Sequence, residues 1–204
     1  MKEVVEYAKT KEEAIKKATT NLNAAEAEIV YSIEEEKKGG LFKTTTYKIK
    51  AITLVDLTEN IKEYLKDIIL NLGINVNFES TIRDRKINIG MYSENSSILI
   101  GKNGQTLKAL EILTKQKILS DYNYHISINI DVENYKEKRI KNLEFLAKKT
   151  ACEVKSTKVE ATLENMNSFE RRIVHNVLTD FKGVTTISEG EEPNRHVIIK
   201  PTDN

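Results

Sequence analysis

Several residue types are scarce in this chain of 204 residues, and each scarcity excludes a class of protein. There is one cysteine, Cys152, so no disulfide can form within the chain, and a reducing compartment is expected. No apolar run approaches the roughly 18 residues that span a bilayer, and the first residues lack the apolar core of a signal peptide. We therefore expect a cytoplasmic protein without a transmembrane segment.

An excess of charge of one sign is also missing. The chain has 32 lysines and arginines against 31 aspartates and glutamates, which leaves a formal net charge of +1. This balance gives no global positive field to attract nucleic acid, so any contact with a polyanion must be local. Aromatic residues make up only 6% and tryptophan is absent, so few side chains can stack on bases.

Candidates for catalysis or metal binding are equally sparse. The histidines, His125, His175 and His196, lie far apart in the sequence, and Cys152 has no second cysteine at metal-ligand spacing. Glu170 and His175 are five residues apart on a predicted helix, so their side chains point in different directions. We expect no cofactor, no metal ion and no enzymatic activity.

The periodicity of apolar residues divides the chain into three segments of mixed helix and strand. Residues 1–55 read as a βαββ unit, and residues 56–132 follow the order αββααβ. Residues 133–204 contain two helices, expected over 133–151 and 168–181, and a small sheet whose first strand is expected over 158–164. The sequence therefore predicts an α+β protein of three small domains with boundaries near residues 55 and 132.

The middle segment contains a short loop between two predicted helices, in which Gly101 and Gly104 flank Lys102 and Asn103. Glycines permit a tight turn whose backbone can approach a phosphodiester chain closely, and Lys102 adds one cation. A plain helix–turn–helix corner would also use two glycines and is the alternative interpretation. The spacing does not fit a nucleotide-binding P-loop, and no strand leads directly into it.

This loop, in its αββααβ setting, resembles the G-x-x-G loop of a type II KH domain, and the resemblance covers about residues 57–131. It implies binding of single-stranded RNA, or of single-stranded DNA, with the backbone held by the loop and the bases in an apolar groove beside it. We expect Gln105 and Thr106, which begin the next helix, to add unpaired amides and the positive end of a helix dipole. We expect Ile98, Leu99 and Leu107 to lie at the floor of the groove.

The last segment places Arg171 and His175 four residues apart on one predicted helix. They lie beside its apolar stripe without belonging to it, and the stripe consists of Phe169, Ile173, Val174, Val177, Leu178 and Phe181. The spacing resembles the signature of the Arg-three-His domain, and residues 185–201 resemble the closing hairpin of that domain. The resemblance implies that Arg171 and Arg172 bind phosphate and that His175 donates to phosphate or stacks on a base. A simple surface pair is the alternative interpretation.

The two domains in tandem behind a βαββ head resemble the bacterial Jag (KhpB) family of RNA-binding proteins. The resemblance implies a regulator in cell elongation, division and envelope control, with a small KH-only protein or a second copy of the chain as partner. The head departs from the family's glycine-rich pattern, since residues 37–42 read "KKGGLF", and we expect its removal to leave RNA binding nearly intact. A protein-interaction scaffold without essential RNA contacts is the alternative that the neutral net charge leaves open.

Overall fold

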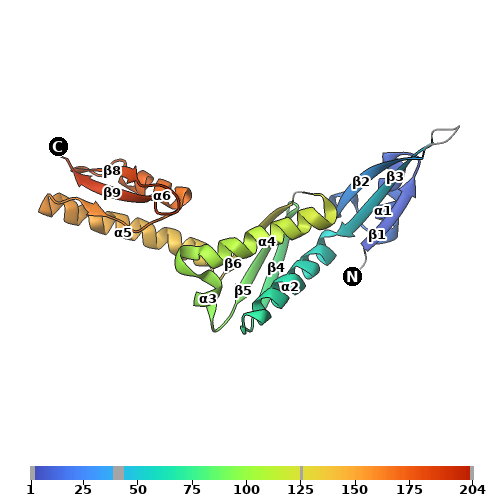
Figure 1. Ribbon diagram of the computed structural model, residues 1–204, viewed down its shortest axis with the longest axis horizontal. Helices are drawn as coiled ribbons and strands as arrows, with labels where there is room; N and C mark the ends of the chain where they lie inside the picture. The colour runs from blue at the N-terminus through green and yellow to red at the C-terminus, as the bar shows by residue number, and fades with distance from the viewer. Residues whose placement is uncertain (1–2, 39–43, 125, 203–204) are drawn as a thin grey trace. The chain divides into compact units, whose positions relative to one another are not determined.

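The structure is a computed structural model that describes residues 3–38, 44–124 and 126–202 (Figure 1). The chain forms two compact units, Met1–Glu133 and Asn134–Asn204. Within the described ranges there are three sheets of three strands, two in the first unit and one in the second. The predicted α+β class with three small domains is confirmed. The glycines of "KKGGLF" and His125 lie outside the described residues.

The head is the predicted βαββ unit. Its elements are β1 (Glu3–Ala8), α1 (Lys11–Leu22), β2 (Ile29–Lys38) and β3 (Thr44–Thr53). The strands form an antiparallel sheet in the order β1-β3-β2. The first turn of α1 is capped by Thr10, whose hydroxyl accepts from the amide of Glu13, and the buried side of the helix packs on the sheet through Ala14, Ala18 and Leu22.

The middle part of the chain, residues 54–132, which resembles a KH domain and is called the KH region below, has the predicted order αββααβ. Its elements are α2 (Leu54–Asn71), β4 (Asn77–Arg83), β5 (Lys86–Tyr92), α3 (Ser96–Ile100), α4 (Gln105–Tyr122) and β6 (Ser127–Val132). Strand β5 lies in the centre, antiparallel to β4 and parallel to β6. Alternate residues of β5 and β6 are buried, as a period of two requires when one face of a sheet is covered: Ile87, Ile89, Met91, Ile128, Ile130 and Val132.

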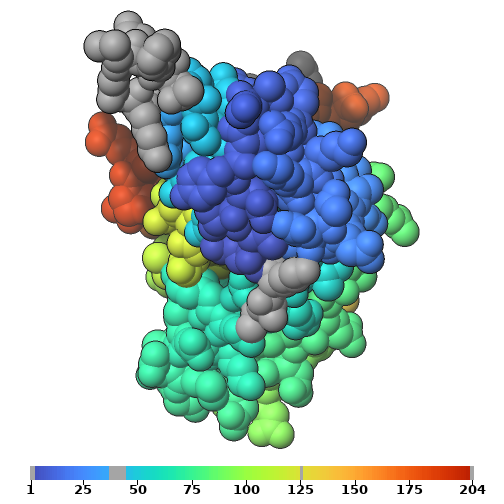
Figure 2. Space-filling model, turned by 90° about the vertical axis from the view of Figure 1, so that its right-hand side faces the viewer, coloured from blue at the N-terminus to red at the C-terminus, as the bar shows by residue number. Residues whose placement is uncertain are grey.

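The head and the KH region are closely joined within the first unit. Strand β3 runs directly into α2, whose N-cap is Thr53, so the predicted boundary at residue 55 falls in the first turn of this helix. Arg85, in the turn between β4 and β5, donates to the carbonyl oxygens of Ala27 and Ile29 at 2.8 and 3.0 Å. Figure 2 shows the blue surface of the head passing without a break into the cyan-green surface of the KH region. The residue limits of the domains stay a prediction.

The second unit packs two helices against a small antiparallel sheet of order β7-β9-β8. Its elements are α5 (Tyr135–Thr157), β7 (Ala161–Thr162), α6 (Ser168–Leu178), β8 (Val184–Glu189) and β9 (His196–Pro201). Helix α5 continues six residues beyond the predicted end at residue 151, and β7 contains two residues where seven were expected. The expectation that Phe169 belongs to the core is wrong, because 58% of this residue is exposed.

None of the helices in the described part of the chain is both long enough and apolar enough to cross a membrane.

Candidate nucleic-acid interface

The Gly101–Gly104 loop follows α3 and leads into α4 through a backbone path that requires glycine at its first position. Gly101 has φ +71°, and a Cβ atom there would collide with the side chain of Thr106 and lie 2.9 Å from its backbone nitrogen. Gly104 and Asn103 also have positive φ, of 77° and 51°. Glycine and asparagine are the residues that adopt this region most readily, so the local sequence suits the turn.

The backbone amides of the loop are partly used by the turn itself. The amide of Gly101 donates to the carbonyl of Ser97 at 2.9 Å, and the amide of Gly104 donates to that of Gly101 at 3.3 Å. The amide of Gln105 donates to the carbonyl of Lys102, so the expectation that Gln105 offers an unpaired amide is wrong.

The start of α4 retains the features expected for an anion contact. Its N-cap is Gly104, which has no side chain that could cap the first turn. The positive end of the helix dipole is therefore not shielded by a capping side chain. The side chains of Lys102 and Gln105 are exposed beside it, and Thr106 is half-buried.

The apolar side chains near the loop do not all lie where we expected them. Leu99 and Leu107 are 0% and 2% exposed and belong to the protein core, so they cannot form the floor of a groove that bases enter. Ile98 is 54% exposed and remains available. Helical periodicity identified the apolar residues of α3 and α4 but not which of them the rest of the domain covers.

Arg171 is a buried residue of α6 and does not lie on the open surface. Its Nη1 atom donates to the carbonyl oxygen of Met166 and to Oε1 of Glu192, both at 2.8 Å. Only 9% of the Arg171 side chain is exposed, against 59% for Glu192. The expected placement of Arg171 at the margin of the apolar stripe is therefore wrong, because the side chain is buried and two protein oxygens already accept from Nη1. Binding of phosphate by Arg171 stays a prediction.

His175 joins α6 to β8 through both of its ring nitrogens. Nδ1 lies 2.6 Å from Oγ1 of Thr186, and Nε2 lies 2.8 Å from Oγ of Ser188. Burial lowers the pKa of His175 below its ordinary value of 6.5, and the nearby charge of Arg171 lowers it further. The neutral ring, with one nitrogen donating and the other accepting, is the form that this environment favours.

Phe169 and Arg172 are among the residues of α6 that do face solvent. Arg172 is exposed, and Phe169 lies three residues earlier on the same side of the helix with 58% of its surface exposed. An exposed aromatic ring beside a guanidinium suits a nucleic-acid contact, because bases stack on the ring and phosphates pair with the arginine. The apolar stripe predicted from the sequence included Phe169. The position of Phe169, three residues before the charged Arg172, is the signal that could have placed this ring on the exposed side of the helix.

The sequence matches three family models in the order that these sites follow along the chain. Residues 7–52 match the Jag N-terminus, residues 60–140 the KH domain, and residues 141–201 the Arg-three-His (R-3-H) domain. An RNA-binding protein KhpB of Clostridium symbiosum is 37% identical over 196 residues, which cover 94% of this chain and 88% of that protein. The chain belongs to the KhpB family.

Further KhpB relatives agree with this assignment. An RNA-binding protein KhpB of Bacillus subtilis (strain 168) is 32% identical over 206 residues, which cover 98% of both chains. One of Streptococcus pneumoniae serotype 2 is 29% identical over 160 residues, which cover 78% of this chain and 47% of that protein. The predicted family and its three domains are thus confirmed.

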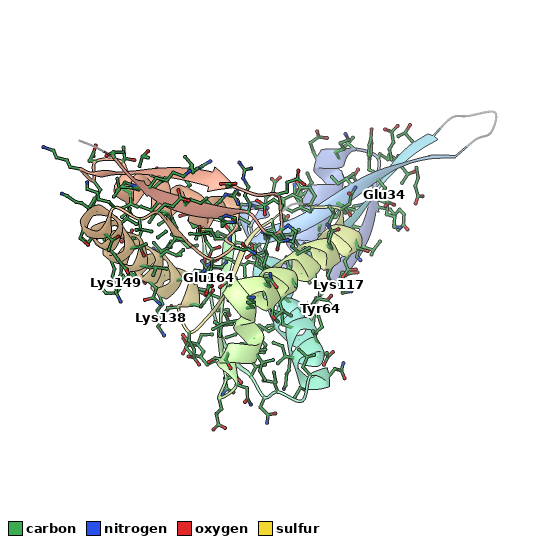
Figure 3. All side chains as sticks on the ribbon, turned by 60° about the vertical axis from the view of Figure 1, so that its left-hand side comes forward. Glu34, Tyr64, Lys117, Lys138, Lys149 and Glu164 are labelled. Carbon is green, nitrogen blue, oxygen red and sulfur yellow. The ribbon has the colours of Figure 1, made fainter. Side chains whose placement is uncertain are left out.

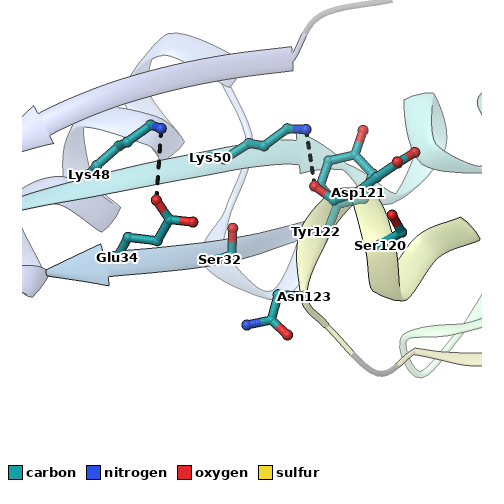
Figure 4. Close-up of a pocket in the computed structure, with 8 residues that line it drawn as sticks. All are labelled: Ser32, Glu34, Lys48, Lys50, Ser120, Asp121, Tyr122 and Asn123. Atoms are coloured by element: carbon teal, nitrogen blue, oxygen red, sulfur yellow. Dashed lines mark hydrogen bonds and ion pairs between the residues drawn. The ribbon is translucent and has the colours of Figure 1, made fainter. Parts of the chain in front are cut away.

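One hollow in the first unit of this KhpB-family chain lies between the head sheet and the end of α4 (Figure 4). Lys48 and Lys50 line it, but Lys48 lies 3.8 Å from a carboxylate oxygen of Glu34, and Lys50 donates to the carbonyl of Asp121 at 3.0 Å. Both ammonium groups therefore already face oxygen atoms of the protein. We assign the hollow to the junction of head and KH domain and not to a ligand.

The acidic side chains and histidines of this KhpB-family chain do not gather into a metal site in its described part. Across the residues that the structure describes, no group of three or more histidine, cysteine, aspartate or glutamate side chains is placed to hold a metal ion. Glu170 accepts from Nε of Arg139 at 2.7 Å and from the amide of Asn167 at 3.0 Å, which gives it a structural role at the start of α6.

Proposed function

We propose that this KhpB-family protein is a non-catalytic regulator that binds single-stranded RNA, with its main backbone contact at the Gly101–Gly104 loop. The observation that carries the proposal is the exposed side chain of Lys102, in a turn between two glycines directly before α4. A Cβ atom at Gly101 would collide with Thr106, so glycine is needed for the turn that presents Lys102 to a phosphodiester. The positive end of α4 lies at the same place.

The second RNA contact in this proposal is on α6, with its roles divided by exposure. Arg172 meets phosphate and Phe169 offers a face for stacking, because both reach solvent. Arg171 and His175 act as positioning residues, since they hold α6 to the β8–β9 hairpin through Glu192 and through Thr186.

Ultraviolet cross-linking in cells, followed by sequencing of the RNA and mapping of the cross-linked peptides, tests this assignment. We expect cross-linked peptides that contain the Gly101–Gly104 loop or the exposed side of α6. Recovery of RNA on neither peptide would contradict the proposal and favour a protein-interaction scaffold. Binding of single-stranded DNA of the same sequence would show that the 2′-hydroxyl is not read.

A protein partner is supported by a separate observation on α4. Ile112 and Leu113 are apolar yet 50% and 46% exposed, on a helix whose other side lies in the core. Exposed apolar side chains side by side are typical of interaction surfaces. We propose that this face contacts a KH-only protein or a second copy of the chain, and light scattering with and without Leu113→Asp distinguishes a homodimer from a monomer that awaits another partner.

The cellular role in this proposal is control of elongation, division and envelope growth through bound RNA in the cytoplasm. Cells that carry only the loop variant Lys102→Asp with Asn103→Asp should then show the same change in length and shape as cells that lack the gene. Normal cell shape in that strain, with the variant present at its usual level, would separate the cellular role from RNA binding by the loop.

A further inference from the structure

The outer side of α5 carries features that neither the KH loop nor α6 accounts for. The inner side of this helix packs in the core of the second unit through Leu143, Ala147, Ala151 and Val154. The side that faces solvent carries lysines and an aromatic ring: Lys138, Phe145, Lys148 and Lys149 are all exposed. Figure 3 shows Lys138 and Lys149 on the side of α5 that is turned away from β8 and β9.

Phe145 is the central feature of this face. It is 70% exposed, more than any other large apolar side chain in the described part of the chain. The helix positions of Lys138, Phe145 and Lys149 place them within about 40° of one another around the axis, since an α-helix has 3.6 residues per turn. Along the axis, Lys138 and Lys149 are about 16 Å apart at 1.5 Å per residue, with Phe145 between them.

Cations outnumber acidic groups on this helix. Helix α5 contains seven lysines and arginines and three glutamates. Glu137 pairs with Lys141 at 2.6 Å, and Arg139 pairs with Glu170 of α6, so these two cations are neutralised. Among the residues that the structure describes, Lys138, Lys148 and Lys149 form no ion pair.

We infer that the outer face of α5, defined by Lys138, Phe145, Lys148 and Lys149, is a third contact site for single-stranded RNA. A base stacks on the ring of Phe145, and the phosphates on either side of that base pair with the lysines. The inference deepens the proposed RNA-binding function and rests on it. Its own support is the combination of an isolated exposed aromatic ring with unpaired cations on both sides.

The arrangement fits a nucleic acid better than an apolar partner. A helix that inserts into a membrane surface needs a broad apolar face, but the apolar stripe of α5 is already buried in the domain core. The adjacent Leu146 is 41% exposed, and Phe145 has Lys141, Lys148 and Lys149 three or four residues away on the helix. A protein interface of stable size requires a larger apolar centre than two side chains.

The experiment measures the affinity of the full chain for a fluorescently labelled single-stranded RNA over a series of salt concentrations. Phe145→Ala should weaken binding about tenfold, the usual effect of losing one stacked base, and Phe145→Tyr should restore it. Replacement of Lys138, Lys148 and Lys149 by glutamine should reduce the slope of log affinity against log salt by about two, because each phosphate contact on a single strand contributes about 0.7.

Matched controls separate this site from general effects of charge and apolar surface. Val159→Ala removes another exposed apolar side chain, 65% exposed in the same unit, and should leave affinity unchanged. Replacement of the exposed Lys16, Lys66 and Lys182 by glutamine makes the same change in net charge elsewhere and should leave the salt slope nearly unchanged.

Each outcome decides between the α5 site and the loop. Wild-type affinity and slope in the α5 variants, with binding lost in a Lys102→Asp, Asn103→Asp variant, would overturn the α5 site and leave the proposed function standing. Loss in the α5 variants with full binding in the loop variant would support α5 and overturn the loop. Unchanged RNA affinity in Phe145→Ala, together with lost binding to vesicles of anionic phospholipid, would assign the face to a membrane surface and overturn the inference.

Discussion

Arg171 of α6 and Glu192 of the β8–β9 connection form a direct ion pair, with Nη1 of the arginine 2.8 Å from Oε1 of the glutamate. The same Nη1 donates to the carbonyl of Met166, just before α6 begins. One buried guanidinium therefore holds the helix, the residue preceding it and the hairpin connection together. A residue expected from its motif to bind phosphate has a structural role in this conformation.

Replacement of Arg171 should destabilise the second unit. Arg171→Ala leaves the carbonyl of Met166 and the carboxylate of Glu192 without their donor, at a cost of about 2 kcal/mol in the free energy of unfolding. Hydrogen–deuterium exchange of peptides from α6 and β9 measures this as faster exchange. Arg172 is the exposed neighbour, and Arg172→Ala is the control. The amides of α6 and β9 in this variant should exchange at the wild-type rate, although the variant should bind RNA less tightly. Equal exchange in both variants would refute the structural role of Arg171.

The stability of the second unit should fall as the pH drops below about 6.5. Because the pKa of His175 is lowered in the folded state, the unfolded chain binds a proton more readily than the folded chain at acidic pH. The contribution of the neutral ring is thus complete above pH 6.5 and is lost progressively below it. His175→Gln should flatten this dependence. An NMR titration of the His175 ring tests the cause directly, and a pKa at or above 6.5 would contradict it.

Alanine substitutions at Gly101 and Gly73 can be compared directly, because both glycines have positive φ but only Gly101 has no space for a Cβ atom. Gly73→Ala meets nothing within 4 Å and should cost only the backbone strain of about 1–2 kcal/mol. Gly101→Ala adds a collision with Thr106, so it should lower the melting temperature further and weaken RNA binding. Equal effects of the two substitutions on stability would show that the loop can open without cost.

Removal of the head should leave most of the RNA affinity but lower the stability of the KH domain. The shortened chain should begin at Thr53, because this residue caps α2. Without the head, Tyr122, only 4% exposed, loses Glu3, whose carboxylate accepts from its hydroxyl at 2.9 Å. Thermal unfolding and RNA anisotropy measure the two effects separately. A tenfold loss of affinity in a shortened chain that remains folded would place RNA contacts in the head.

The sequence predicted the KH region best, because its periodic patterns agree with one another. Alternating isoleucines identified β5 and β6, and the pair of glycines located the turn between α3 and α4. These signals are local, since each depends on neighbours within a few residues. The order of elements therefore followed from the sequence alone.

The side chains that the sequence misplaced depend on contacts between distant segments. Arg171 is buried, and its partner Glu192 comes 21 residues later in the chain, so spacing along the helix could not reveal the contact. Leu99 is buried and Phe169 exposed although both lie in apolar patterns, since periodicity defines a face without saying what covers it. The end of α5 at Thr157 was missed because its last turns carry few apolar residues to mark them.

The RNA affinity of a variant with Lys102→Asp and Asn103→Asp tests most directly whether the Gly101–Gly104 loop holds the RNA backbone. Both glycines remain, and aspartate adopts the positive φ of Asn103 about as readily as asparagine does, so the turn should be preserved. One cation is replaced by two anions at the proposed phosphate contact. This change should cost on the order of 2 kcal/mol or more, about thirtyfold in affinity.

The control makes the same chemical change at Lys16→Asp on α1 and Asn23→Asp at the C-cap of this helix, where Asn23 also has positive φ and both side chains are exposed. We predict unchanged circular dichroism for both variants, wild-type affinity for the control, and about thirtyfold weaker binding for the loop variant. Wild-type RNA affinity in a correctly folded loop variant would contradict the claim that this loop holds the RNA backbone.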